Sequence, residues 1–312
     1  MIAIDKPAGM TSHDVISAVR RVTGEGRVGH AGTLDPFATG VLVVCIGPAT
    51  RLADLAMAHD KEYEARISFG TQTDTDDLTG EPVESVEPAD CVLDETYAQD
   101  ALRRFTGTIL QVPPQYSAKK IGGRKAYEIA RGGEVADVAP VEVTVSRAEL
   151  LGLGMAASEV GGAECPYWDV RLEVSKGTYI RALARDIGIA CGTRAHLASL
   201  RRTRSGSVDA SQCLRLDMLE RQYAPGLLDV VALDPAEVLG YPVLEARGRE
   251  MERVANGSPF DDRWDLERGT RASVTSEGRL RAVYESDGRG SLRCKIMIPG
   301  GVAGVRSRAD ER

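Results

Sequence analysis

Residues 29–40, with the sequence GHAGTLDPFATG, constrain the fold of this chain more than any other stretch. Glycines and one proline surround the carboxylate of Asp35, a composition typical of a loop rather than of a helix interior. The apolar run Val41–Ile46 follows at once and predicts a buried strand. A loop that is anchored by a core strand can hold a reactive carboxylate rigidly in place. The same Asp-Pro pair also fits an ordinary turn with an Asx cap.

Length and composition predict a globular chain of one large domain or two. The chain has 312 residues, of which 43% are hydrophobic. It begins without a basic and apolar leader, and no run approaches 18 apolar residues, so we expect no signal peptide, no membrane association and a cytoplasmic location. The cysteines are dispersed and form no CxxC, which argues against a zinc site or a disulfide framework.

Charge is unevenly distributed along the chain. The net charge of -7 is unfavourable for contacts with phosphates, but residues 71–100 alone hold ten acids and no Lys or Arg, and without them the net charge is +3. Such segregation allows one positive face, although each basic cluster also fits ordinary solvated surface. The basic clusters are Lys119, Lys120, Arg124, Lys125 and Arg131, and then Arg194, Arg201, Arg202 and Arg204.

Apolar spacing predicts helices and strands that interleave without a clean βαβ repeat, which favours a mixed α/β (α+β) fold over a doubly wound one. Residues 71–95 are predicted to be loop-rich, and residues 152–162 to be a hairpin-like connection. We expect helices from Thr11 or Ser12 to Val22 and at 50–58, 97–105 and 180–187, and strands at 62–69, 141–145 and 168–174.

The C-terminal quarter is predicted to be a small β-rich domain. Pro and Gly recur between Pro225 and Pro242, and short β-type runs follow at 272–275, 280–284 and 292–298. We therefore expect two domains, residues 1–235 and 240–312. A GxGxxG match at residues 24–29 follows a helix rather than a strand and does not indicate dinucleotide binding.

Residues 29–40 resemble the catalytic loop of the TruB family of tRNA pseudouridine synthases. Further segments resemble other motifs of the same family, and this resemblance implies the pseudouridine synthase fold, with a largely antiparallel central sheet flanked by helices and a C-terminal domain of the PUA type. The other segments that resemble the family's motifs, in the family's order, are 4–12 (IDKPAGMTS), 61–65 (KEYEA) with 70–76 (GTQTDTD), 113–120 (PPQYSAKK), 175–181 (SKGTYIR) and 200–206 (LRRTRSG).

The resemblance implies isomerisation of uridine to pseudouridine at position 55 of the tRNA T-loop, by base flipping, carboxylate-assisted glycosidic cleavage and C5–C1′ rejoining. It implies no metal or organic cofactor, and a monomer that binds the T-arm without an obligate protein partner. Two alternatives stay open: a catalytic subunit that depends on guide RNA, and a non-catalytic module for tRNA binding or folding. The acidic chain argues against the first and the intact set of site residues against the second.

By the same resemblance, Asp35 is the catalytic carboxylate, whether it attacks C1′ or the base. Arg181 pairs with Asp35 and keeps it ionised and oriented, and Tyr179 accepts the C5 proton. His30 fills the space of the flipped base, Tyr63 stacks on the uracil and Leu200 walls the pocket, although these side chains also fit core packing or surface positions. Expected RNA contacts come from Lys119, Lys120, Arg201 and Arg202.

Overall fold

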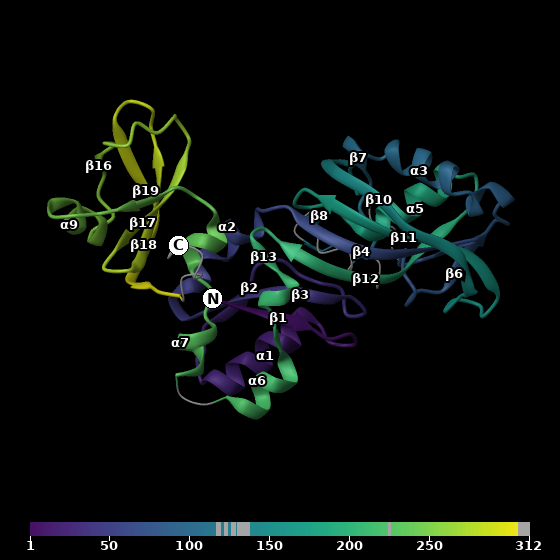
Figure 1. The fold of residues 1–312 in the computed structure, drawn as a ribbon, viewed down its shortest axis with the longest axis horizontal. Coiled ribbons are helices and arrows are strands. Elements are labelled where there is room, and N and C mark those ends of the chain that lie inside the picture. Colours follow the sequence, from purple (N-terminus) through teal and green to yellow (C-terminus); the bar gives the residue numbers. More distant parts are fainter. Residues whose placement is uncertain (117–119, 122–123, 126–128, 130–137, 224–225, 305–312) are drawn as a thin grey trace. The chain divides into compact units, whose positions relative to one another are not determined.

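The computed structural model describes the chain except at residues 117–119, 122–123, 126–128, 130–137, 224–225 and 305–312 (Figure 1). The chain divides into two compact units. Met1–His59 and Arg204–Arg312 form the first, here called the terminal unit, and Asp60–Thr203 form the second, the central unit. The terminal unit is therefore built from both ends of the sequence.

The N-terminal strand lies inside the sheet of the terminal unit. β1 (Ile2–Lys6) pairs antiparallel with β3 (Thr39–Ile46), and β3 also pairs antiparallel with β2 (Val28–His30). β1 pairs in parallel with β14 (Leu214–Arg215). The buried strand predicted after residue 40 is confirmed, because the side chains from Gly40 to Cys45 are buried.

Helix α1 (Ser12–Thr23) confirms the predicted first helix. Thr11 and Asp14 form a reciprocal capping box at its start, and Gly24 ends it in the left-handed conformation at φ +70°. Its apolar side packs against the sheet and against α6 (Leu216–Gln222). The buried residues of this cluster include Ile4, Val15, Val19, Leu42, Leu216 and Leu219.

A five-stranded sheet forms the C-terminal part of the terminal unit, in the order β15-β17-β18-β19-β16. The three predicted strands of this region are confirmed as β17 (Arg271–Ser276), β18 (Arg279–Ser286) and β19 (Ser291–Val302). The other elements here are α7 (Leu227–Val231), α8 (Pro235–Leu239), β15 (Val243–Glu245), α9 (Arg249–Ala255) and β16 (Phe260–Asp261).

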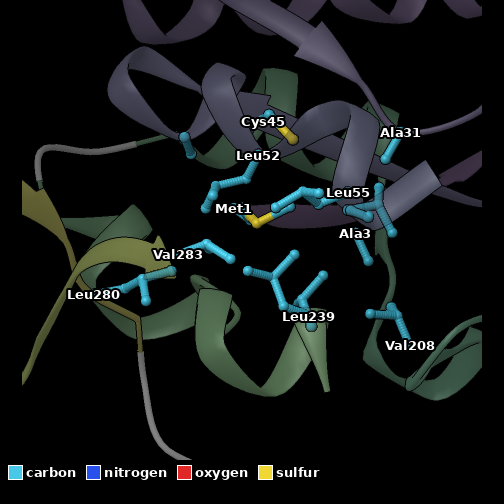
Figure 2. Close-up of a cluster of buried hydrophobic side chains, with 14 of the residues drawn as sticks. Met1, Ala3, Ala31, Cys45, Leu52, Leu55, Val208, Leu239, Leu280 and Val283 are labelled. Carbon is cyan, nitrogen blue, oxygen red and sulfur yellow. The ribbon is translucent and has the colours of Figure 1, made fainter. Parts of the chain in front are cut away.

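One apolar cluster joins this C-terminal sheet to the first residues of the chain (Figure 2). Leu280 and Val283 of β18 share it with Met1, Leu52 and Leu239.

The boundary between two domains that the sequence predicts at residues 235–240 stays a prediction. The short elements between β3 and residue 60 and after Ser205 are η1 (Gly47–Leu52), α2 (Ala53–Met57), β13 (Val208–Asp209) and η3 (Ala210–Gln212).

The central unit contains a sheet in the order β12-β4-β11-β10-β7, in which β4, β11, β10 and β7 are paired antiparallel. This confirms the mixed α/β fold with a largely antiparallel sheet. The predicted hairpin connection is confirmed, because β10 and β11 pair antiparallel around a turn at 158–163. Its length is a correction, because β10 continues to Ala157 and pairs with β11 as far as Glu164. The strands are β4 (Lys61–Phe69), β7 (Gly107–Gln111), β10 (Val141–Ala157), β11 (Glu164–Val174) and β12 (Ala195–Ser205).

The acidic segment 71–95 is also more ordered than predicted. It holds a two-stranded sheet of β5 (Thr71–Thr73) and β6 (Pro82–Ser85), a 3-10 helix η2 and the start of α3. The buried Trp168 side chain fixes this segment, since its indole N–H donates to the Val92 carbonyl oxygen over 2.8 Å. The remaining bounds are η2 (Asp90–Leu93), α3 (Glu95–Arg103), α5 (Ile180–Ala190), β8 (Lys120–Ile121) and β9 (Arg124–Lys125).

Candidate active site

Asp35 lies in the loop between β2 and β3 of the terminal unit. The Ala31 N–H donates to the Val43 carbonyl oxygen over 2.9 Å, and the Ala38 N–H donates to the Asp35 carbonyl oxygen over 3.1 Å. Leu34 and Ala38 are buried, whereas Asp35 itself is half-buried. The carboxylate is therefore carried by a short loop whose neighbouring side chains are anchored in the core.

Lys6 supports this loop, a role that sequence analysis did not assign. Its side chain is fully buried, and its ammonium donates to the carbonyl oxygens of Pro7, Met10 and Pro36 over 2.9, 2.7 and 3.1 Å. The Gly9 N–H donates to the same Pro36 oxygen over 2.8 Å. Buried carbonyls of irregular turns need donors, and one ammonium can supply three. A lysine directly before a Pro-x-Gly turn is the sequence signal that could have found this role.

The start of α1 also contacts the loop. The Ser12 hydroxyl accepts from the Leu34 N–H over 2.9 Å and lies 3.2 Å from the Leu34 carbonyl oxygen, to which it donates. His30 ends β2 at the base of the loop, and its ring meets that of His13 edge to face at a centroid distance of 6.4 Å. His30 is half-buried, and its contact with RNA stays a prediction.

In the central unit, Tyr63 and Leu200 come from the neighbouring strands β4 and β12 and are both buried. The Thr203 hydroxyl donates to the Glu62 carboxylate over 2.8 Å, which places these two side chains on one face of the sheet. Because side chains alternate along a strand, Tyr63 and Leu200 lie on the other face. The expected uracil platform and the expected apolar wall therefore share a face.

The four cations expected to contact RNA differ in where they lie and in how far they are buried. Arg202 lies on the same face as Tyr63 and is buried, with 1% of its surface exposed, so it is not a solvated surface cation. Arg201 is half-buried and lies on the opposite face of the sheet. Lys119 lies outside the described residues, and Lys120 belongs to β8. Residues 201 and 202 therefore do not form one basic surface patch.

Tyr179 is the residue that precedes α5, and a buried glutamine fixes its backbone. The Tyr179 N–H donates to Oε1 of Gln111 over 2.9 Å, and Nε2 of Gln111 donates to the Tyr179 carbonyl oxygen over 3.1 Å. Gln111 has no exposed surface and ends β7. The Gln111 side-chain amide thus fixes the backbone position from which the Tyr179 side chain extends. Sequence analysis missed Gln111, whose signal was only a polar residue beside the PPQYS motif.

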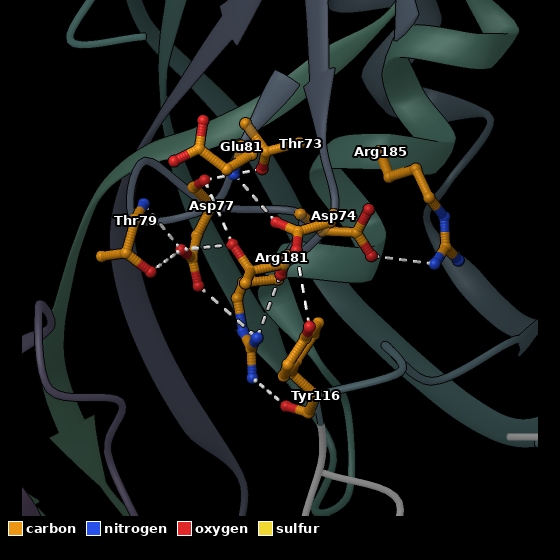
Figure 3. A network of polar contacts seen from close by, with 10 residues as sticks. Thr73, Asp74, Asp77, Thr79, Glu81, Tyr116, Arg181 and Arg185 are labelled. Atoms are coloured by element: carbon orange, nitrogen blue, oxygen red, sulfur yellow. Dashed lines mark hydrogen bonds and ion pairs between the residues drawn. The ribbon is translucent and has the colours of Figure 1, made fainter. Parts of the chain in front are cut away.

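Arg181, in the first turn of α5, is buried and held by acceptors from two distant segments (Figure 3). Nη1 donates to the Thr75 carbonyl oxygen over 3.0 Å and lies 3.5 Å from Oδ2 of Asp77. Nη2 donates to the Tyr116 carbonyl oxygen over 3.0 Å. These contacts fix the plane of the guanidinium, which a fork of donors can do and a single ammonium cannot.

Asp77 is oriented in turn by its neighbours. Its Oδ1 accepts from the hydroxyls of Thr75 and Thr79 over 2.8 and 2.6 Å, and from the Thr79 N–H over 2.9 Å. The adjacent Asp76 pairs with Arg185 over 3.0 Å. Burial raises the pKa of Asp76, while Arg185 opposes that rise. Two acids of the acidic segment are thus internal partners of α5 and not solvated charges, a role that sequence analysis missed.

The expected pairing of Arg181 with Asp35 joins residues of the two units and stays a prediction. Among the described residues, no group of three or more His, Cys, Asp or Glu side chains is arranged to hold a metal ion. No helix in the described part of the chain is long and apolar enough to cross a membrane.

Comparisons with known proteins identify the family. The family model for the N-terminal domain of TruB family pseudouridylate synthases matches residues 20–180, and that for the tRNA pseudouridylate synthase B C-terminal domain matches residues 181–236. The chain is 41% identical to tRNA pseudouridine synthase B of Mycobacterium ulcerans (strain Agy99) over 96% of this chain and 95% of that protein. It is 45% identical to the protein of that name from Thermobifida fusca (strain YX), over 82% and 85%.

Among solved structures, one chain of a Cbf5-Nop10-Gar1 complex is similar with a TM-score of 0.67. The match covers 97% of this chain and 87% of that chain at 22% identity, so it supports the fold alone. The family-model matches and the identities over most of the chain decide the relationship: this chain belongs to the TruB family of pseudouridylate synthases.

Proposed function

We propose that this protein converts uridine to pseudouridine at position 55 in the T-loop of tRNA, without a guide RNA or an obligate protein partner. The observation that carries the proposal is the extended similarity to proteins named tRNA pseudouridine synthase B, at 41% and 45% identity. The geometry is compatible with it. The half-buried Asp35 lies on a loop that is held through its backbone. A group that must meet a reacting atom in one orientation needs such support.

The reaction breaks the N1–C1′ bond of the nucleotide, turns the uracil and joins C5 to C1′, while the C5 proton leaves. In the proposed division of labour, Asp35 assists cleavage, Arg181 keeps that carboxylate ionised and oriented, and Tyr179 accepts the C5 proton. The flipped uracil rests on Tyr63 against Leu200, and His30 fills the space that it leaves. Substrate and product are isomers, because the proton lost from C5 is balanced by one gained at N1, so the reaction consumes no second substrate.

Incubation of the purified protein with an unmodified T-arm hairpin, without guide RNA, tests the proposal. Release of the C5 hydrogen from labelled transcript, together with base-specific mapping of pseudouridine, should report turnover at the T-loop uridine. Turnover only after addition of a guide RNA would favour a guide-dependent catalytic subunit. Tight binding without hydrogen release would favour a non-catalytic tRNA-binding or tRNA-folding module.

Residues 1–235 are proposed to carry the chemistry, and residues 240–312 to form a PUA-like domain that holds the tRNA stem. We further propose that the enzyme works as a monomer in the cytoplasm, where its substrate is processed. Fractionation of cells that express the tagged chain tests the location, and light scattering of the purified protein tests the monomer.

A further inference from the structure

Helix α5 carries two arginines that reach the same two segments of the central unit (Figure 3). Arg181 lies in the first turn and Arg185 one turn later, and residues four apart lie on one side of a helix. Each of them donates to the turn at residues 74–77, here called the acidic turn, and to the segment 112–116 that follows β7. The proposed reaction uses Arg181 and gives no role to Arg185.

Arg185 holds both segments through its guanidinium. Nη1 donates to Oδ2 of Asp76 over 3.0 Å, and Nη2 donates to the Val112 carbonyl oxygen over 2.8 Å. Nε donates to the neighbouring Asp186 over 2.9 Å. The other carboxylate oxygen of Asp76 accepts from the Gln72 side-chain amide over 3.1 Å. Asp76 is buried, and each of its two carboxylate oxygens has a donor.

The backbone of Asp76 joins the two groups of the acidic turn that Arg181 contacts. Asp76 has a φ of +60°, in the left-handed region that residues other than glycine seldom adopt. The Thr75 carbonyl precedes Asp76 and Asp77 follows it, so the torsion angles of Asp76 decide how these two acceptors lie relative to each other. The Leu197 N–H donates to the Asp76 carbonyl oxygen over 3.0 Å, which attaches the turn to β12.

The connection from Val112 to Tyr116 is stiff at its start. Pro113 and Pro114 are both buried, and each proline ring locks its own φ at about -65°. A displacement of Val112 can therefore be passed on to Tyr116, whose carbonyl oxygen accepts from Nη2 of Arg181. Through Asp76 and Val112, Arg185 supports acceptors of Arg181 on both segments.

The pair of Asp76 and Arg185 fits a role in orientation better than a role in stability. Burial raises the pKa of the Asp76 carboxyl, because the charged form loses water, and the positive charge of Arg185 opposes this rise. Replacing a buried ion pair by apolar groups often leaves stability unchanged, and in some proteins such pairs select one conformation. The conformation selected here is the one in which the acidic turn presents its acceptors to Arg181.

We propose that Asp76 and Arg185 are positioning residues for the reaction, which act by fixing the guanidinium of Arg181 and do not contact the RNA. This inference rests on the proposed function, because it takes the orientation of Asp35 as the task of Arg181. Loss of the pair should let the acidic turn and the Tyr116 carbonyl shift. The chemical step should then slow, while the affinity for RNA is retained.

Single-turnover rates at saturating T-arm hairpin, together with equilibrium binding, test the proposal. Arg185→Met and Asp76→Asn should each lower the rate about tenfold and leave affinity within about twofold. Asparagine tolerates the left-handed region, so Asp76→Asn removes the charge without adding backbone strain. The matched control is Asp169→Asn, which breaks the ion pair with Arg66 on the sheet face opposite Tyr63. It should keep the rate within about twofold.

The route through Arg181 has a test of its own. In an Arg181→Lys background, where the guanidinium is already lost, Arg185→Met should slow the reaction by less than about twofold more. If the two losses multiply instead, Arg185 acts independently of Arg181 and the proposal is wrong. Urea denaturation is measured for each variant. A less stable Arg185→Met protein that reacts at the parent rate when folded would show a structural role only, and would also contradict the proposal.

Crystal structures decide the positioning without any turnover. In Arg185→Met, the guanidinium of Arg181 should lie about 1 Å or more from its place in the parent, whereas Asp169→Asn should leave it in place. If the parent converts no uridine but Arg181 moves, the proposed function fails and Arg185 still positions Arg181. If Arg181 keeps its place in Arg185→Met, the positioning role is wrong, whether or not the parent is active.

Discussion

At the residue scale, the charge of Asp35 should matter for turnover more than the shape of its loop. Three hydrogen bonds hold the loop through the Leu34 N–H and the carbonyl oxygens of Asp35 and Pro36, and Asp35→Asn leaves these three in place. We expect this variant to abolish pseudouridine formation while T-arm affinity stays within a few-fold, measured by base-specific mapping and by equilibrium binding. Turnover within about tenfold of the parent would contradict the assignment of Asp35.

Arg181→Lys should be far from conservative. The guanidinium contacts Thr75, Asp77 and Tyr116 at once, and an ammonium keeps the charge without the planar fork. We expect the single-turnover rate at saturating RNA to fall by roughly 10²-fold or more, since misplacing a reacting group by about 1 Å can cost that much. Tyr179→Phe is the comparison, because it should slow chemistry through the lost proton acceptor. If Arg181→Lys weakens binding alone, Arg181 is a phosphate contact instead.

At the scale of elements, the Asp35 loop should depend on a buried side chain of β1. Lys6→Met removes the donor to three carbonyl oxygens, and unsatisfied buried acceptors are costly. We expect a loss of about 3 kcal/mol in the free energy of unfolding, measured by urea denaturation. The matched control is Lys295→Met, which breaks an exposed ion pair with Glu285 and should cost less than about 1 kcal/mol. Equal losses would mean that Lys6 contributes no more than a surface charge.

Elements with local signals could be predicted from the sequence. α1 carries its own capping box and its own αL glycine, and both signals lie within the helix and its two neighbours. Gly152 and Gly154 misled about where the turn begins, because pairing with β11 decides their conformation, whereas Gly161 and Gly162 do lie in the turn, at φ +82° and +71°. Gly154 stands opposite Tyr167, and a Cβ at Gly154 would approach that ring to 3.3 Å. The glycine there makes room for a cross-strand aromatic ring and does not mark a turn.

Contacts between distant residues could not be predicted from local patterns. Arg181 reaches the Thr75 carbonyl across 106 residues of sequence, and Gln111 reaches Tyr179 across 68. The family resemblance named Tyr179 and Arg181, but composition presented Asp76 and Asp77 only as part of an acidic run. Their burial beside α5 follows from tertiary packing, which no sequence period encodes.

At the scale of the whole molecule, binding to RNA should depend on basic clusters despite the net charge of -7. Log affinity for the T-arm should fall linearly with log salt, with a slope near -0.7 for each phosphate neutralised on single-stranded segments. Reversing Lys119, Lys120 and Arg124 together to glutamate should flatten that slope, measured by titrations at several salt concentrations. A salt-independent affinity would mean that shape and stacking dominate binding.

The course of the chain explains why a domain boundary is hard to read from composition. Pro and Gly between residues 225 and 242 indicate a linker, yet Leu239 and Val283 lie in one core with Met1 and Leu52 (Figure 2). A linker sequence can therefore join two parts that share buried surface. Such sharing predicts that the C-terminal residues contribute stability in addition to any affinity for RNA.

Removal of residues 240–312 tests both contributions. A chain that ends at Leu239 loses Leu280, Val283 and Ile298 from the shared core, and each large apolar side chain uncovered costs about 1.5–3 kcal/mol. We expect a lower Tm and weaker T-arm binding, but a measurable single-turnover rate at saturating RNA, because every recognised motif lies before residue 215.

The full-length variant Leu280→Ala separates packing from RNA contact. It should cost about 2–5 kcal/mol in unfolding free energy through the cavity that it leaves, with T-arm affinity unchanged under conditions where the fold is intact. If Leu280→Ala weakens binding as much as the truncation does, the C-terminal residues act through packing and not through RNA. If the truncated chain keeps its fold but loses its rate at saturation, residues 240–312 take part in the chemistry and the division of roles between the two segments is wrong.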